Sequence, residues 1–350
     1  MKDFEPVKAL LRQATTNRVF PSAVVEVGTS HQVIWRESFG TLSYDFEAPL
    51  AAENTVFDLA SLTKVIATTT LTMIQLENGA LHLDNRIGNW LHEWKGSDRD
   101  NVTIRDLLAH TSGLTAHLPF FLDCSGRADF QQAICTMPLE YTPRTQSIYS
   151  DLGFILLGFI IEDAGGKSLK EQFENTVSRY DLGNLAFQPP HTWRLRTAPT
   201  EVDSWRGRLL VGEVHDQNAW ALEGIAGHTG LFGEITSLGR FAQLILKTKQ
   251  GLSTLVNPVT LDEFISRVKI PNSSRALGWD TMLPTSSCGT RMSPLAIGHT
   301  GFTGTSLWID IPSDTYVSLL TNRVHPSRTN EQILAFRPAF HDGIMAVLGH

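Results

Sequence analysis

The chain has 350 residues, of which 42% are hydrophobic and 19% charged, proportions typical of a globular protein rather than a disordered or fibrous one. Its formal net charge is -7, so no basic excess favours nucleic acid as a partner. The longest apolar run, Leu152 to Ile161, is too short to span a bilayer.

The first elements predicted along the chain are a helix and a hairpin. Apolar residues at helical spacing predict an amphipathic helix at the N-terminus: Phe4, Val7, Leu10 and Leu11. Ser22–Val27 is rich in β-branched residues and Gln32–Arg36 alternates in polarity, so both are predicted strands. The short polar stretch between them favours a hairpin.

The next element carries a candidate nucleophile. Ser61 and Lys64 form an S-x-x-K motif at the start of an apolar helical stretch, and Asp58 is placed to cap that helix. Residues three apart share a helix face, so the Lys64 amine can reach the Ser61 hydroxyl and act as its base. Burial and the positive end of the helix would both lower the pKa of Lys64, as a neutral base requires.

Tyr149 supplies a second candidate group. It precedes an apolar stretch, Leu152–Ala164, that a Gly-Gly pair ends, and it alone of five tyrosines begins a Tyr-x-Asp sequence, with Asp151. A phenol beside a lysine can share a proton with it and pass one to a leaving group. The alternative interpretation is a packing tyrosine followed by Asp151 as a helix cap.

Three late strands are predicted at Ile297–Thr300, Ser306–Asp310 and Tyr316–Leu320, with a turn at residues 311–314. A final helix is expected from about Asn330 to Leu348, with a kink at Pro338.

The first of these strands runs into a His-Thr-Gly triplet, His299, Thr300 and Gly301, which a strand edge could lay beside a substrate acyl group. Gly301 would permit close approach of the backbone. The backbone N–H groups of Ser61 and Phe302 could then form an oxyanion hole.

Other segments are interpreted as structural. Ser266 and Lys269 repeat S-x-x-K in a charged helical stretch typical of a solvated face, and a second His-Thr-Gly at His228 is followed by a helix-start signal rather than by more strands. Four arginines in the loops could clamp a carboxylate, although a solvated surface is the simpler interpretation: Arg194, Arg196, Arg206 and Arg208.

Strands at both chain ends and helices in the middle predict an α+β fold with two lobes. Residues 1–58 and 228–350 would form an α/β sandwich lobe around one antiparallel sheet, and residues 59–227 an inserted, mainly helical lobe. The active site is expected in the cleft between them.

The three cysteines show no paired spacing, which favours free thiols in a reducing compartment: Cys124, Cys135 and Cys288. The acidic N-terminus lacks the pattern of a signal peptide, so a cytoplasmic protein is expected, although removal of a signal would leave the same sequence. No phosphate loop or metal-binding spacing is present, so no cofactor and no metal are expected.

In this order, the motifs at Ser61, Tyr149 and His299 resemble those of the serine β-lactamase and penicillin-binding-protein superfamily. The tyrosine motif and wide spacings are similar to class C β-lactamases, D-aminopeptidases and family VIII esterases. Residues 212–219 and 226–232 resemble a narrower bacterial subgroup, which includes penicillin-binding protein 4B and a muropeptide amidase that cleaves N-acetylmuramic acid from L-alanine.

The resemblance implies a β-lactamase/transpeptidase-like fold. It also implies that Ser61 is the nucleophile, Lys64 its base and Tyr149 the proton relay, and that residues 299–301 are the substrate-binding strand.

Two departures from the family pattern concern substrate choice. His299 replaces the usual lysine, and Asp151 replaces the asparagine of the lactamases. A histidine with an ordinary pKa of about 6.5 is mostly neutral at pH 7, and an added carboxylate repels an anion, so binding of a β-lactam carboxylate is disfavoured. Asp151 would also raise the pKa of Lys64 and so oppose its role as a neutral base.

The leading interpretation is a serine hydrolase that acts through an acyl-enzyme on small amides or esters, with peptidoglycan-derived muropeptides first. The alternatives are a family VIII-type carboxylesterase or a weak β-lactamase. A non-catalytic penicillin- or acyl-binding sensor belongs to another class, which intact Ser61, Lys64 and Tyr149 disfavour. Asp151 joins residues 299–301 as an expected substrate contact.

Overall fold

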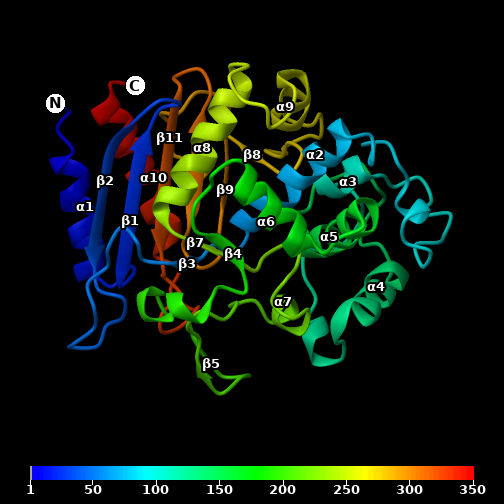
Figure 1. Cartoon of the computed structure of the whole chain (residues 1–350), viewed down its shortest axis with the longest axis horizontal. Coiled ribbons are helices and arrows are strands. Elements are labelled where there is room, and N and C mark those ends of the chain that lie inside the picture. The colour runs from blue at the N-terminus through cyan, green and yellow to red at the C-terminus, as the bar shows by residue number, and fades with distance from the viewer. Residues whose placement is uncertain (1) are drawn as a thin grey trace.

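The computed structural model describes residues 2–350 and is built around a six-stranded antiparallel sheet in the order β2-β1-β11-β10-β9-β8 (Figure 1). The strands are β1 (Ser22–Gly28), β2 (Val33–Gly40), β8 (Asp280–Thr281), β9 (Ala296–Thr300), β10 (Ser306–Asp310) and β11 (Thr315–Thr321). The two ends of the chain meet where β1 pairs with β11, from Ala23 opposite Thr321 to Gly28 opposite Tyr316. The α+β fold with a sheet built from both chain ends is therefore confirmed.

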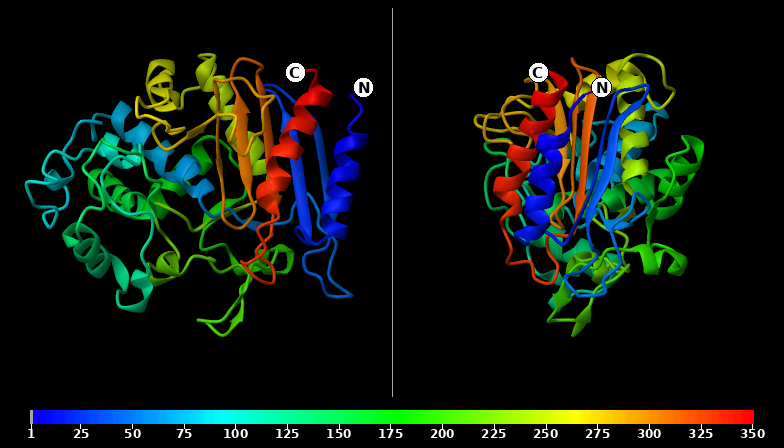
Figure 2. Two further views of the ribbon diagram at one scale, coloured as in Figure 1. Left: turned by 180° about the vertical axis from the view of Figure 1, so that it is seen from behind. Right: turned by 90° about the vertical axis from the view of Figure 1, so that its left-hand side faces the viewer.

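Helices cover both faces of this sheet. Helices α1 (Glu5–Thr16) and α10 (Ile333–Leu348) lie on one face and α8 (Ile235–Lys249) on the other, as Figure 2 shows. Side chains alternate across a strand, so Val25 and Val27 of β1 join the core under α1 and α10, whereas Val24 joins the larger core under α8. Pro338 lies inside α10, which continues to Leu348.

The middle of the chain is mainly helical, and α5 lies at its centre. All residues from Leu152 to Ile161 are buried in α5, and Gly166 ends the helix with a φ of +63°. No helix among residues 2–350 is both long enough and apolar enough to cross a membrane. The α-helices of this part are α2 (Thr70–Glu77), α3 (Ile104–Leu108), α4 (Gly126–Thr136), α5 (Asp151–Gly165), α6 (Leu169–Arg179) and α7 (Gln217–Ala221), and α9 (Pro258–Ile265) follows α8.

Shorter elements complete the chain. A π-helix, η1 (Lys64–Thr69), precedes α2, and three 3₁₀ segments are η2 (Ile87–Asn89), η3 (Phe120–Leu122) and η4 (His191–Arg196). Two small sheets were not predicted: one joins β3 (Phe57–Asp58), β7 (Leu231–Gly233) and β4 (Leu185–Phe187), and the other joins β5 (Val202–Asp203) and β6 (Arg208–Leu209). In the first, Phe232 of β7 pairs with Asp58 on one side and with Ala186 on the other. The proposed division into two lobes stays a prediction.

Gly227 marks a close approach between the loop before β7 and helix α5. A Cβ at this position would lie 2.1 Å from the Phe154 carbonyl oxygen and 2.9 Å from the Gly158 nitrogen, both backbone atoms. We expect Gly227→Ala to destabilise the protein by at least about 1–3 kcal/mol, because the backbone itself would have to move. Urea unfolding of the wild-type and variant proteins measures this difference.

Gly343→Ala in α10 is the matched control. Its new Cβ would meet only the Val7 side chain, at an ordinary contact of 3.4 Å, and alanine favours the helix. This variant should be neutral or slightly stabilised. Equal stabilities for the two alanine variants would contradict the close-approach explanation.

Candidate active site

Ser61 follows a strained turn. Ala60 has a φ of +47°, which is rare for a residue with a Cβ. The Asp58 carboxylate supports the turn, since its Oδ1 accepts from the Ala60 N–H at 2.8 Å and its Oδ2 from the His215 N–H at 2.7 Å. The prediction that Asp58 caps the helix is therefore wrong, because both carboxylate oxygens are used by the turn and by a neighbouring loop.

The π-helix η1 begins at Lys64, three residues after Ser61, so Ser61 stands in the turn before the regular helix. Lys64 is fully buried, and its Nζ donates at 3.0 Å to Ser61 Oγ, at 2.7 Å to Asp151 Oδ1 and at 2.9 Å to the His228 carbonyl. These three bonds use every N–H of an ammonium group.

The charge of Lys64 is set by two opposing effects. Burial alone would lower the pKa of Lys64, but the nearby Asp151 carboxylate and the Tyr149 side chain raise it above its ordinary value. Lys64 is therefore an ammonium at neutral pH. Of the two opposing influences expected from the sequence, burial and the Asp151 carboxylate, the carboxylate prevails in the resting site.

Tyr149 lies beside Lys64, with its ring centroid 4.8 Å from Lys64 Nζ and 4.9 Å from the Arg275 guanidinium carbon. Burial raises the pKa of Tyr149, and the neighbouring Lys64 only partly offsets this. The side chain is therefore a neutral phenol, which can donate a proton to a leaving group.

Strand β9 delivers His299 to the same place. Its ring centroid lies 5.8 Å from that of Tyr149, and its Nδ1 bonds the Thr300 carbonyl at 2.8 Å. Burial, together with Arg275 and Lys64, holds the pKa of His299 well below its ordinary value. The ring is neutral, Nδ1 carries its hydrogen, and the buried Nε2 has no hydrogen-bond partner among residues 2–350.

Two threonines hold the segment after β9 against the turn before Ser61. Thr303 Oγ1 donates to the Asp58 carbonyl at 2.7 Å, and Thr305 Oγ1 donates to the Leu59 carbonyl at 3.0 Å. The two segments that carry the predicted oxyanion-hole donors therefore lie side by side.

The contact is close at Gly301, where a Cβ would lie 2.6 Å from the Leu59 carbonyl oxygen. The backbone N–H groups of Ser61 and Phe302 make no hydrogen bond to any group within residues 2–350. Both are therefore available to an incoming oxyanion.

These residues line a cavity of about 640 Å³, which is large enough for a small organic substrate. The cavity contains the candidate residues predicted from the sequence except Lys64, which lies behind them: Ser61, Tyr149, Asp151, His299, Thr300, Gly301 and Phe302. Its other polar lining residues were not predicted as site residues, chief among them His117, His215, Asp216, His228, Arg275, Arg323, Arg328 and Arg337.

His228 belongs to the second His-Thr-Gly triplet, for which the sequence predicts a structural role. It lies before β7 and not on β9, but its carbonyl accepts from Lys64 and its Nε2 lies 3.1 Å from Asp216 Oδ1. Two features of the sequence could have indicated that His228 belongs to the site: the repeated His-Thr-Gly and the resemblance of residues 226–232 to the narrower subgroup.

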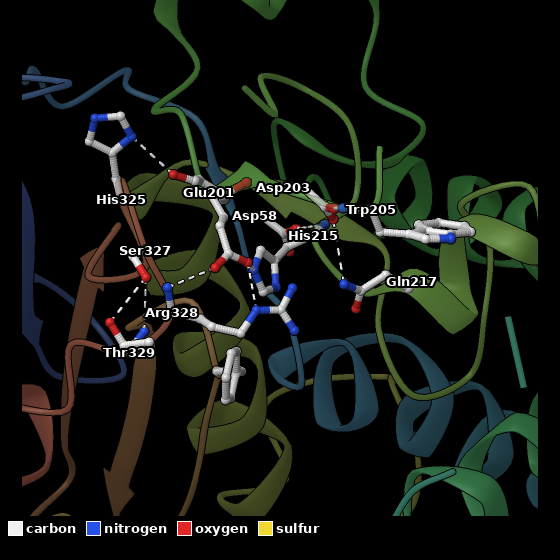
Figure 3. A network of polar contacts seen from close by, with 12 residues as sticks. Asp58, Glu201, Asp203, Trp205, His215, Gln217, His325, Ser327, Arg328 and Thr329 are labelled. Carbon is white, nitrogen blue, oxygen red and sulfur yellow. Dashed lines mark hydrogen bonds and ion pairs between the residues drawn. The ribbon is translucent and has the colours of Figure 1, made fainter. Parts of the chain in front are cut away.

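A polar network supports the cavity wall beside Phe302. Figure 3 shows Glu201 between His215 and Arg328: its Oε2 lies 2.9 Å from His215 Nε2 and 2.6 Å from Arg328 Nε. These partners hold the pKa of Glu201 at about 2 although burial opposes it. The His215 ring in turn stacks on the Phe302 ring, with centroids 5.7 Å apart.

The loop arginines do not share one environment: Arg194 and Arg208 fit the solvated interpretation, whereas Arg206 fits neither interpretation. Arg206 is buried, pairs with Asp203 at 2.8 Å and donates to the Val214 and His215 carbonyls, so it is neither solvated nor free to bind a substrate. Arg194 and Arg208 are exposed.

Ser266 is not part of the cavity. Helix α9 ends before it at Ile265, and the exposed Ser266 hydroxyl donates to the Asp262 carbonyl at 2.6 Å. Ser266 therefore does not share a helix face with Lys269. The two S-x-x-K motifs thus differ in local geometry, since Ser61 Oγ contacts Lys64 Nζ.

Residues 7–337 match the family model described as Beta-lactamase. The chain is 30% identical to the "Putative D-alanyl-D-alanine carboxypeptidase" of Escherichia coli (strain K12), with 87% of this chain and 79% of that protein covered. It is 29% identical to the N-acetylmuramyl-L-alanine amidase of Bacillus subtilis (strain 168), covering 87% of this chain and 78% of that protein.

The fold is also that of EstCE1, a hydrolase with promiscuous acyltransferase activity. The TM-score is 0.74 at 20% sequence identity, with 95% of this chain and 98% of the EstCE1 chain covered. At this identity the likeness shows the fold alone.

Proposed function

The chain belongs to the beta-lactamase family of hydrolases, and from that premise we propose that it cleaves an amide bond of small muropeptides through an acyl-enzyme on Ser61. The observation that carries this proposal is the contact of Ser61 Oγ with Lys64 Nζ at 3.0 Å beside two free backbone N–H groups. The relative named N-acetylmuramyl-L-alanine amidase supports the choice of substrate class.

In the proposed acylation, the active form is the one in which Lys64 has lost its proton. Ser61 Oγ attacks the carbonyl carbon and gives its proton to Lys64, while the N–H groups of Ser61 and Phe302 stabilise the oxyanion. Tyr149 donates its proton to the leaving nitrogen and regains one from Lys64. Water then hydrolyses the ester by the reverse use of the same groups.

The charges of the cavity support a polar substrate. Asp151 and Asp216 line the cavity with carboxylates, which accept hydrogen bonds from hydroxyl or amide groups. Arg275 lines it near His299 and is paired only loosely with Asp280, at 4.0 Å. Arg275 therefore gives this end of the cleft a positive charge, which the expectation of disfavoured carboxylate binding, based on His299 and Asp151, did not include.

Product analysis of MurNAc-L-Ala-D-Glu by mass spectrometry tests the proposal. Wild-type protein should release free MurNAc, and Ser61→Ala protein should release none. If no cleavage occurs in a preparation that hydrolyses a short p-nitrophenyl ester, the esterase alternative replaces the amidase. A stable acyl adduct on Ser61 without turnover would instead favour the sensor.

Arg275→Gln tests whether Arg275 binds a carboxylate of the substrate. We expect acylation of Ser61 by a penicillin to slow about 10- to 100-fold, the value of one charge-assisted hydrogen bond, while acylation by the penicillin methyl ester changes little. Mass spectrometry of the adduct gives both rates. An equal loss for the acid and the ester would show that Arg275 acts through Tyr149 rather than on the substrate.

We also propose a cytoplasmic location and a small molecule, not nucleic acid, as the partner. The three free thiols support the reducing compartment, and burial raises the pKa of Cys135 and of Cys288 to about 12, which keeps both unreactive.

A further inference from the structure

Arg337, on helix α10, is a buried cation without a counter-ion. Its exposed fraction is 5%, and no carboxylate within residues 2–350 lies within 4.0 Å of its guanidinium nitrogens. Burial and the nearby Arg323 lower its pKa to about 9, so it still carries its charge at neutral pH. An unpaired buried charge is costly, and its presence calls for a role that needs the charge.

Arg337 contacts the segment after β9 that carries the Phe302 N–H. Its Nη2 donates at 2.8 Å to the Gly301 carbonyl and at 2.9 Å to the Thr305 carbonyl. The Gly301 carbonyl and the Phe302 N–H belong to one peptide group, and in a planar trans peptide the two point in opposite directions. Because Arg337 binds the Gly301 carbonyl, the Phe302 N–H of the same peptide points away from Arg337.

We propose that Arg337 is a positioning residue that fixes and polarises the Gly301–Phe302 peptide, so that the Phe302 N–H stabilises the oxyanion more strongly. A charge-assisted hydrogen bond to the carbonyl strengthens the N–H of the same peptide as a donor. The free-energy cost of burying the Arg337 charge arises when the protein folds, so it does not add to the barrier of the reaction. This inference rests on the proposed function, since it takes Phe302 N–H as an oxyanion-hole donor.

The neighbouring Arg323 serves as a comparison. Its Nε donates to the next carbonyl, that of Phe302, at 2.8 Å, and its guanidinium carbon lies 4.3 Å from the centroid of the Phe302 ring. It therefore holds the side chain and the following peptide. Of the two arginines, Arg337 is the one that acts on the peptide that carries the candidate donor.

A purely structural role would give a different result on mutation. Each carbonyl bound by Arg337 keeps a second backbone donor without it: Gly304 N–H reaches the Gly301 carbonyl at 3.1 Å, and Gly301 N–H reaches the Thr305 carbonyl at 2.8 Å. Removing the guanidinium thus leaves neither carbonyl without a partner and relieves an unpaired buried charge. Stability and catalysis should therefore change in opposite directions.

The experiment compares Arg337→Met with Arg291→Met, a control in which an exposed arginine also donates to a backbone carbonyl, that of His350. For Arg337→Met we expect kcat for a neutral p-nitrophenyl ester to fall about 10- to 100-fold with KM nearly unchanged. The inhibition constant of a neutral boronic acid, which forms a tetrahedral adduct on serine, should weaken by a similar factor, and Tm should hold or rise. Arg337→Lys should recover part of the lost kcat.

Other results overturn the inference. Unchanged kcat with a lower Tm would make Arg337 structural, and a rise in KM confined to anionic esters would make it a substrate-binding cation. A wild-type protein whose Ser61 does not react with the boronic acid would overturn the proposed function itself, and that failure is seen before any Arg337 variant is made.

Discussion

Ser61→Ala protein should lose turnover of every substrate, by at least about 1000-fold in kcat, because it lacks the hydroxyl that lies 3.0 Å from Lys64 Nζ and that we propose forms the acyl-enzyme. The fold should persist. The Ser61 side chain is only partly buried, and without it Lys64 keeps its bonds to Asp151 and to the His228 carbonyl. Initial rates with a neutral ester, together with thermal unfolding, measure both expectations.

Ser266→Ala is the matched control, because Ser266 also stands three residues before a lysine. Its hydroxyl donates only to a carbonyl of helix α9 on the surface, so its loss should leave the rates unchanged. Full activity in Ser61→Ala protein, with loss in Ser266→Ala protein, would show that the wrong serine had been chosen.

Local patterns predicted the elements that carry the site. β-branched and alternating segments located β1, β2, β9, β10 and β11 to within a few residues, because strand signals are local: β1, β9, β10 and β11 are largely buried, and β2 buries only Trp35 and Phe39. The apolar run 152–161 and the glycines after it located α5. A single antiparallel sheet built from both chain ends was predicted, and the pairing of β1 with β11 is where the two ends meet.

The supporting groups could not be found in this way, because each acts through contacts distant in sequence. Asp58 reads as a helix cap, yet its carboxylate accepts from His215 N–H, 157 residues away. Arg337 reads as one more residue of a terminal helix, and its bond to Gly301 appears only when α10 packs behind the sheet. Sequence spacing carries no signal for either contact.

The charge of Lys64 also depends on a contact between residues distant in sequence. The S-x-x-K motif correctly places Lys64 beside Ser61, but the outcome for its pKa depends on the contest between burial and Asp151. The sequence revealed both influences. Only the 2.7 Å contact between Lys64 Nζ and Asp151 Oδ1 decides that the carboxylate prevails.

Asp151→Asn should therefore make the enzyme active at lower pH. The reactive form has a neutral Lys64, so the rate rises as pH passes the pKa of Lys64. With the carboxylate gone, burial is left to lower that pKa, and the profile should move to lower pH by about 1–3 units. At pH values below the Lys64 pKa of both proteins, the Asp151→Asn variant should then react about 10- to 1000-fold faster than the wild type.

Stability should move the other way. Because the folded-state pKa of Lys64 is raised, the ion pair stabilises the fold fully at pH values below the unfolded pKa, and this contribution is lost as pH rises through the folded pKa. Asp151→Asn removes the contribution, so the variant should be less stable at neutral pH and approach the wild type at alkaline pH. Urea unfolding at several pH values measures this trend.

The pH profile of kcat/KM with a neutral ester separates this mechanism from a general effect of charge in the cavity. Asp280→Asn is the matched control, since Asp280 also lines the cavity but faces Arg275, and its loss should leave the profile nearly in place. If Asp151→Asn left the profile unmoved, or moved it to higher pH, the ionisation that limits the rate would not be that of Lys64. The proton of Ser61 would then have to pass first to another group, and Tyr149 is the neighbour within reach.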